Sequence, residues 1–144
     1  MKGVKAHKNT HFGGFMGENT PSENEWLIME IIWNAGRSMT ASEIIQELKD
    51  SVSISDKTIR VMINRLVAKG VLSYTVDEKD ARVYHYEAAR SREECLAVKS
   101  DRFVKNFFGG DTSLAIANFL RSADISREQL EELKRMVEQM EKDD

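Results

Sequence analysis

Residues 55–70 constrain the fold of this 144-residue chain more than any other segment. Apolar side chains recur in the segment at steps of three and four, which places them on one side of a helix. They are Ile59, Met62, Ile63, Leu66 and Val67. Ser55 can cap the start of this helix, and Gly70 can stop it. A strand-like run, residues 71–76, follows at once. The segment therefore predicts an amphipathic helix that leads directly into a β-strand.

The opposite side of the same helix mixes cations, hydrogen-bonding groups and one small apolar side chain. Such a surface suits phosphates and base edges in a DNA groove, although a solvated helix looks partly similar. With the capping Ser55 included, the predicted DNA contacts are Ser55, Lys57, Thr58, Arg60, Val61, Asn64 and Arg65. Arg60 and Asn64 are the better candidates for base edges, Val61 for a thymine methyl group and Lys57 for a phosphate. For Arg65, a salt bridge within the protein is an open alternative.

The net charge of −3 argues at first against nucleic acid as a partner. The distribution of charge matters more than its total. Residues 55–69 carry four cations, Lys57, Arg60, Arg65 and Lys69, against Asp56 alone. We therefore expect the positive charge to be local to the proposed DNA-binding side of the helix.

Two further helices precede this one. Ser22 and Glu25 form a capping-box pattern at the start of a helix over residues 22–35, and Thr40 and Glu43 repeat the pattern for a second helix. Three helices with a short loop before the third describe a helix-turn-helix.

After the third helix, β-branched and aromatic residues at 71–76 and 81–86 flank a polar turn at 77–80, which predicts a β-hairpin. The fold class is therefore mainly α with a small hairpin wing, a winged helix-turn-helix. Lys79 and Arg82 of the wing are its predicted phosphate contacts. We expect His85 to pack on the hairpin rather than to bind a metal ion.

From residue 91 the pattern changes to three amphipathic helices without a sheet, over residues 91–108, over 112–121 and after Ser126. They could close on the winged core or interlock with the same region of a second chain. The second arrangement is favoured because a symmetric dimer presents two recognition helices to a palindrome. The predicted dimer contacts are Phe107, Leu114, Phe119, Leu120, Leu130, Leu133 and Val137. The expected division is a flexible leader over residues 1–21, a DNA-binding domain over 22–90 and a dimerisation domain over 91–144.

Several classes of protein are disfavoured. No apolar run approaches the roughly 18–20 residues of a membrane span, and no secretory signal is seen. The single cysteine, Cys95, excludes an intrachain disulfide. His7 and His11 have no third metal ligand nearby. No nucleophile–base set or phosphate-binding glycine loop suggests an enzyme. We expect a cytoplasmic protein without a metal or cofactor and without a membrane partner.

Several separated motifs together resemble one family of repressors. They are EW at 25–26 with Met29 and IW at 32–33, TASEII at 40–45, SDKTIR at 55–60, NRLVAKG at 64–70, FFGG at 107–110 and NFL at 118–120. In this order they resemble the penicillinase and methicillin-resistance repressors (BlaI/MecI), a family that also includes the copper-responsive CopY repressors. The resemblance covers residues 21–138.

The resemblance implies a homodimeric repressor on a palindromic double-stranded DNA operator of resistance or metal-homeostasis genes. In the β-lactam branch of the family, a membrane-bound sensor protease triggers cleavage between Asn and Phe, which ends repression. The matching bond is Asn118–Phe119. A purely structural role for this pair is the alternative, because Phe119 lies on an apolar helix face.

One departure argues against the copper branch. CopY-like repressors carry a repeated CxC motif near the C-terminus, whereas this chain has no cysteine after Cys95. Thiolates are the ligands that select Cu(I), so only a Cys95 pair bridging two chains would remain. A copper- or other signal-responsive winged-helix regulator is the alternative function, and a winged-helix protein–protein adaptor is a further one.

Overall fold

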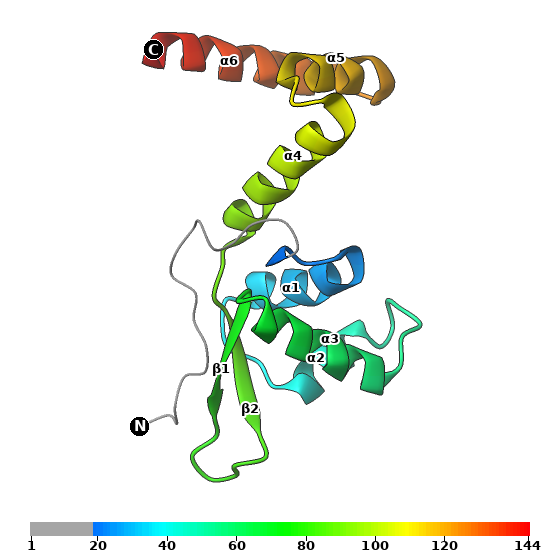
Figure 1. Cartoon of the computed structure of the whole chain (residues 1–144), viewed down its shortest axis with the longest axis vertical. Coiled ribbons are helices and arrows are strands. Elements are labelled where there is room, and N and C mark those ends of the chain that lie inside the picture. The colour runs from blue at the N-terminus through cyan, green and yellow to red at the C-terminus, as the bar shows by residue number, and fades with distance from the viewer. Residues whose placement is uncertain (1–18) are drawn as a thin grey trace. The chain divides into compact units, whose positions relative to one another are not determined.

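A computed structural model describes residues 19–144, and helix-capping side chains set the start of most of its helices. The elements, shown in Figure 1, are α1 Glu23–Ala35, α2 Ala41–Leu48, α3 Asp56–Ala68, β1 Leu72–Val76, β2 Tyr84–Ala88, α4 Arg92–Phe108, α5 Thr112–Ser122 and α6 Arg127–Asp143. The leader predicted over residues 1–21 lies outside the described residues, except for its last three positions.

The two capping boxes expected from the sequence are present. The Ser22 hydroxyl accepts a hydrogen bond from the Glu25 amide at 3.2 Å, and the Glu25 carboxylate accepts one from the Ser22 amide at 3.0 Å. Thr40 and Glu43 make the same reciprocal pair at the start of α2. Because each box satisfies two backbone N–H groups that the helix itself leaves unpaired, both helix starts are well defined.

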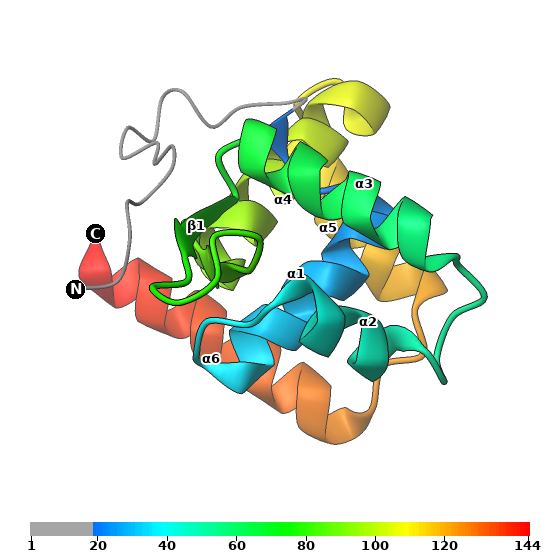
Figure 2. The same ribbon diagram turned by 90° about the horizontal axis from the view of Figure 1, so that it is seen from below.

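The apolar sides of α1, α2 and α3 meet the wing in one core. Its most deeply buried side chains include Ile28, Met29, Ile44, Ile59, Ile63, Leu66, Val71 and Leu72. Figure 2 shows the three helices around this centre, with β1 beside them. Together with the hairpin, they form the winged helix-turn-helix that the sequence predicts.

The wing is an antiparallel pair in which Tyr74 faces Tyr86 and Val76 faces Tyr84. Met39, between α1 and α2, exchanges two backbone hydrogen bonds of 2.8 Å with Tyr86. These bonds connect the outer edge of β2 to the helices. They hold the wing in a fixed position relative to the helix-turn-helix.

The sequence-based prediction of the hairpin's second strand was wrong in its limits. The second strand is Tyr84–Ala88 rather than 81–86, and the connection is residues 77–83 rather than a four-residue turn. The cause is hydrogen bonding by two carboxylates. Asp77 accepts from the amides of Lys79 and Asp80, and Asp80 accepts from the amide of Arg82, which folds these residues into a longer loop.

The described chain divides into two compact units, one ending at Arg102 and the other spanning Phe103–Asp144. The first part of α4 belongs to the winged unit, where Cys95 and Val98 join the core. The side-chain N–H of Trp33 donates to the Arg90 carbonyl at 2.9 Å, and Arg92 contacts Glu30 at 2.7 Å. These contacts fix the start of α4. The functional boundary at residues 90–91 stays a prediction.

In the second unit, Gly109 and Gly110 adopt left-handed conformations with φ of 59° and 85°, which ends α4 and starts the turn into α5. Four aromatic rings gather around this turn. Phe103 lies 6.0 Å from Phe119 and 5.0 Å from Phe107, and Phe108 lies 6.0 Å from Phe119, centroid to centroid. Ala115 is buried within this unit.

Candidate nucleic-acid interface

The predicted DNA-contacting residues of α3 share one exposed side of the helix. Its buried side consists of Ile59, Met62, Ile63 and Leu66. The exposed side chains on the other face are Lys57, Thr58, Arg60, Val61, Asn64 and Arg65. The structure therefore brings together all six residues of the helix that the sequence selected. What they contact stays a prediction.

Ser55, which is also predicted to contact DNA, caps the start of α3. Its hydroxyl accepts from the Thr58 amide at 3.2 Å and donates to the Thr58 hydroxyl at 2.9 Å. The two hydroxyls remain exposed at the start of α3. Because both are already hydrogen-bonded, they hold the first turn of α3 in place, and each retains lone pairs for further contacts.

Lys69 does not add to the cationic surface of α3. Its ammonium lies 2.6 Å from the Glu25 carboxylate and donates to the Thr20 carbonyl at 3.1 Å. Glu25 is 2% exposed, so its charge needs this partner. Sequence reasoning counted Lys69 among the local cations and missed the pair, because the residues are 44 positions apart.

The other cations of α3 are not paired with a carboxylate in this way. Within residues 19–144, no ion pair involves Lys57, Arg60 or Arg65. The alternative of an internal salt bridge for Arg65 is therefore not what the described part of the chain shows. Three cations on one exposed helix face form a surface that attracts phosphates.

The wing loop, residues 77–83, carries the other two predicted contacts. Lys79 and Arg82 are both exposed. The Arg82 guanidinium lies 3.1 and 3.2 Å from the two carboxylate oxygens of Asp80. This pairing holds the pKa of Asp80 below its usual value. Lys79 therefore projects from a loop in which the other cation already has a carboxylate partner.

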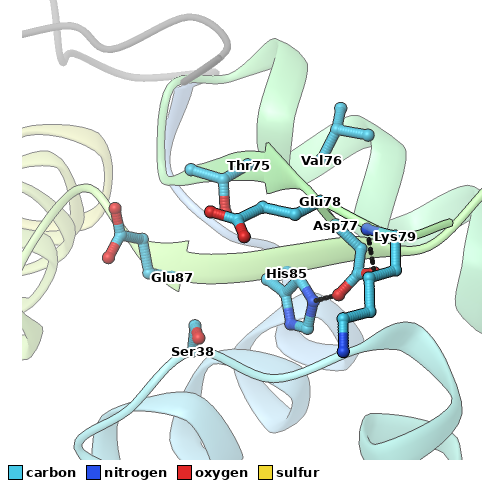
Figure 3. Close-up of a pocket in the computed structure, with 8 residues that line it drawn as sticks. All are labelled: Ser38, Thr75, Val76, Asp77, Glu78, Lys79, His85 and Glu87. Atoms are coloured by element: carbon cyan, nitrogen blue, oxygen red, sulfur yellow. Dashed lines mark hydrogen bonds and ion pairs between the residues drawn. The ribbon is translucent and has the colours of Figure 1, made fainter. Parts of the chain in front are cut away.

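A cavity of about 710 Å³ lies beside the wing, as Figure 3 shows. Its lining consists of Ser38, Thr75, Val76, Asp77, Glu78, Lys79, His85 and Glu87. The ring of His85 is 2.8 Å from the Asp77 carboxylate. This hydrogen bond, with those from the Lys79 and Asp80 amides, lowers the pKa of Asp77. His85 thus contacts the hairpin, and within residues 19–144 no three metal-binding side chains form a group.

Cys95 is inaccessible in the core of the winged unit. Its side chain is fully buried, and burial raises the pKa of its thiol to about 12. A thiol with such a pKa is protonated at neutral pH and is a poor metal ligand. The bridging Cys95 pair considered from the sequence would therefore require the core to open.

The Asn118–Phe119 bond lies inside α5. The Asn118 carbonyl accepts from the Ser122 hydroxyl at 2.7 Å, and the Phe119 carbonyl accepts from the Ala123 amide at 2.9 Å. The Phe119 ring contacts Phe103 and Phe108. A protease needs an extended backbone, so cleavage at this bond would require local unwinding of α5.

The predicted dimer contacts are exposed in the single chain. Their exposed fractions range from 39% for Leu133 to 72% for Phe107, and the set comprises Phe107, Leu114, Phe119, Leu120, Leu130, Leu133 and Val137. Ile116, Met136 and Met140 extend the same kind of surface. We call these ten exposed side chains the apolar surface of the second unit, and large exposed apolar side chains in such number are typical of interaction sites. Among the described helices, none is long and apolar enough to cross a membrane.

Comparison with known proteins yields a consistent set of matches. The family model described as "Penicillinase repressor" matches residues 21–139. The penicillinase repressor of Bacillus licheniformis is 32% identical over 82% of this chain and 89% of its own length. The methicillin resistance regulatory protein MecI of Staphylococcus aureus is 29% identical over 81% and 91%. The solution structure of the DNA-binding domain of the repressor BlaI aligns with a TM-score of 0.44 at 30% identity, covering 55% of this chain and 93% of that domain.

Proposed function

The chain belongs to the penicillinase repressor family and is a DNA-binding transcriptional repressor, and we propose that it acts as a cytoplasmic homodimer on a palindromic operator. The genes that it controls are of the β-lactam-resistance type or related to them. The observation that carries this proposal is the exposed side of α3. Its three cations form no ion pair with a carboxylate within residues 19–144. Steric exclusion of the polymerase from the promoter is the mode of repression.

In this mechanism, each protomer inserts α3 into a major groove. The two helices of a dimer then lie about 34 Å apart, one turn of the double helix. Arg60 and Asn64 read base edges, and Val61 contacts a thymine methyl group. Lys57, with Lys79 and Arg82 of the wing, binds phosphates, while Ser55, Thr58 and Arg65 complete the contact surface.

The dimer forms through the apolar surface of the second unit. Burial of this surface against a second copy is favoured at about 25 cal/mol for each Å² of apolar area. A C2 dimer of this kind matches the symmetry of a palindrome.

Repression ends by proteolysis at Asn118–Phe119, through a sensor-protease pathway. The bond lies within α5, in the unit proposed to form the dimer, so cutting it separates Phe119, Leu120 and α6 from the earlier part of the proposed interface. Incubation of the full chain with membranes from induced cells should yield a fragment ending at Asn118, identified by mass spectrometry. Intact protein in de-repressed cells would contradict this route.

The test of the proposed function starts from the DNA that copurifies with the full chain. Sequencing this DNA should reveal one palindromic site, and the affinity for that site should fall steeply with salt. Each neutralised phosphate contributes about −0.9 to the slope of log K against log salt concentration. Binding that does not depend on salt, or the absence of any enriched palindrome, would refute the proposal.

A further inference from the structure

The wing loop contains more acidic than basic side chains. Residues 77–83 carry Asp77, Glu78 and Asp80 against Lys79 and Arg82. A loop of this composition has a net negative charge. The phosphate backbone of DNA repels such a loop unless the cations of the loop face the DNA and its carboxylates bind other groups of the protein.

The carboxylate of Asp80 occupies one of the two N–H edges through which the Arg82 guanidinium can bind a phosphate. Its Oδ1 accepts from the Arg82 Nε–H at 3.1 Å and from the Arg82 amide at 3.0 Å, and its Oδ2 accepts from an Nη2–H at 3.2 Å. A phosphate is bound by the same fork of N–H donors. While the ion pair persists, this Nε/Nη2 edge is closed to a phosphate, and only the Nη1/Nη2 edge of the guanidinium remains for one.

The Asp80–Arg82 ion pair can be replaced by a pair between Arg82 and a phosphate. The Arg82 side chain is 90% exposed, whereas that of Asp80 is 39% exposed. Ion pairs at such sites contribute little to stability because water competes for both partners. A phosphate that approaches the wing can thus replace Asp80 at low cost, while the amide of Arg82 keeps the loop in shape by its bond to Asp80.

On this basis we propose that Asp80 is a positioning residue that withholds Arg82 from DNA until the wing is seated against the backbone. The inference rests on the proposed function, because it takes the wing as a phosphate-binding element. Each encounter with DNA exchanges one ion pair for another, so Arg82 adds less affinity than a free cation would. The consequence is weaker binding to non-cognate DNA, where affinity depends on phosphate contacts alone.

The test compares Asp80→Asn with the unchanged full-length protein on a fluorescently labelled duplex of random sequence. Asparagine can still accept the Arg82 amide, but it does not hold the guanidinium charge. We expect Asp80→Asn to bind this duplex about two- to fivefold more tightly at low salt. The slope of log K against log salt concentration should become steeper by about 0.9, the value for one phosphate.

Two controls separate release of Arg82 from a general effect of charge. In an Arg82→Gln background, Asp80→Asn should raise affinity no more than Glu78→Gln does in the unsubstituted protein, and it should leave the slope unchanged. Glu78→Gln removes one charge from the same loop and leaves the Asp80–Arg82 pair intact, so its effect should be smaller. An equal gain in the Arg82→Gln background, an equal gain from Glu78→Gln, or unchanged or weaker binding by Asp80→Asn would overturn the inference.

A further test follows Arg82 in the unsubstituted protein by NMR. The NMR signal of the Arg82 Nε–H should shift when the duplex is added to the free protein. A signal that does not move while the protein binds with a steep salt dependence overturns this inference alone. An unsubstituted chain that binds no duplex overturns the proposed function as well.

Discussion

Cys95 is fully buried in the winged unit, and burial raises the pKa of its thiol to about 12. An unfolded cysteine titrates near pH 8.5. Above about that pH, the unfolded chain releases a proton that the folded chain keeps, so the free energy of unfolding falls as pH rises. The expected decline from this group is up to about 1.4 kcal/mol per pH unit.

Urea unfolding from about pH 8 to pH 10 checks this prediction against Cys95→Ala. In the alanine variant a cavity replaces the sulfur, which lowers stability by an amount that does not depend on pH, so the slopes are compared rather than the absolute values. The slope of the unsubstituted protein should be the steeper one. Parallel curves for the two proteins would show that the Cys95 thiol titrates alike in the folded and unfolded states.

Arg60 and Lys57 differ in the kind of DNA contact that we expect. Arg60→Ala should cost about 1–3 kcal/mol on the recovered operator and should reduce discrimination against changes at one base pair. Lys57→Ala should weaken binding to all sequences nearly equally and should reduce the salt slope by about 1. Gel-shift titrations on the operator and on single-base variants measure both effects. Unchanged operator affinity for Arg60→Ala would rule out its role in reading a base.

At the scale of elements, the Glu25–Lys69 pair connects the start of α1 to the end of α3. Glu25 is buried and also completes the capping box, so one carboxylate supports both helices. Lys69→Met leaves this carboxylate buried without its cation. We expect the free energy of unfolding to drop by about 3 kcal/mol, the lower end for a broken buried pair.

The double variant Glu25→Gln with Lys69→Met provides the control for this prediction. Glutamine can still accept the Ser22 amide, and it carries no charge that needs a cation. The double variant should therefore be more stable than Lys69→Met alone, as measured by urea unfolding. If it is less stable, the loss in Lys69→Met comes from lost packing of the lysine stem rather than from the uncompensated charge.

Elements were predictable from the sequence where one local signal defined them. The capping pairs of Ser22 with Glu25 and of Thr40 with Glu43 are three residues apart, and the structure contains both. The wing was placed correctly, but its second strand was not. The β-branched and aromatic residues favoured a strand over residues 81–86, whereas hydrogen bonds that nearby amides donate to the carboxylates of Asp77 and Asp80 extended the loop to residue 83. Such bonds compete with strand pairing and leave no periodic trace.

The candidate site was predictable to the same degree. The exposed side of α3 follows from helical periodicity, so the exposure of Arg60 and Asn64 was predicted correctly, while their contact with DNA stays a prediction. The neutralisation of Lys69 by Glu25 was not found, because it joins residues far apart in sequence. Nor does periodicity show that Asp80 faces Arg82.

At the scale of the whole molecule, the two units differ in how far their large apolar side chains are buried. The winged unit buries most of its large apolar residues, whereas α5 and α6 leave most of theirs exposed, and α6 has no buried residue at all. An exposed apolar surface costs free energy in water until a partner covers it. The second copy proposed above would cover this surface, and operator binding would then depend on the concentration of dimer.

Leu133 tests this proposal because it lies on the apolar side of α6 and is 39% exposed. Leu133→Glu places a charge where the partner chain would exclude water, so it should weaken both the dimer and operator binding. Gln139→Glu adds the same charge on the polar side of α6 and should leave the dimer intact. Sedimentation equilibrium measures the dimer, and anisotropy measures operator binding over the same concentrations. If Leu133→Glu dimerises as well as Gln139→Glu does, the interface lies elsewhere. If it loses the dimer but keeps full operator affinity, each protomer binds DNA independently.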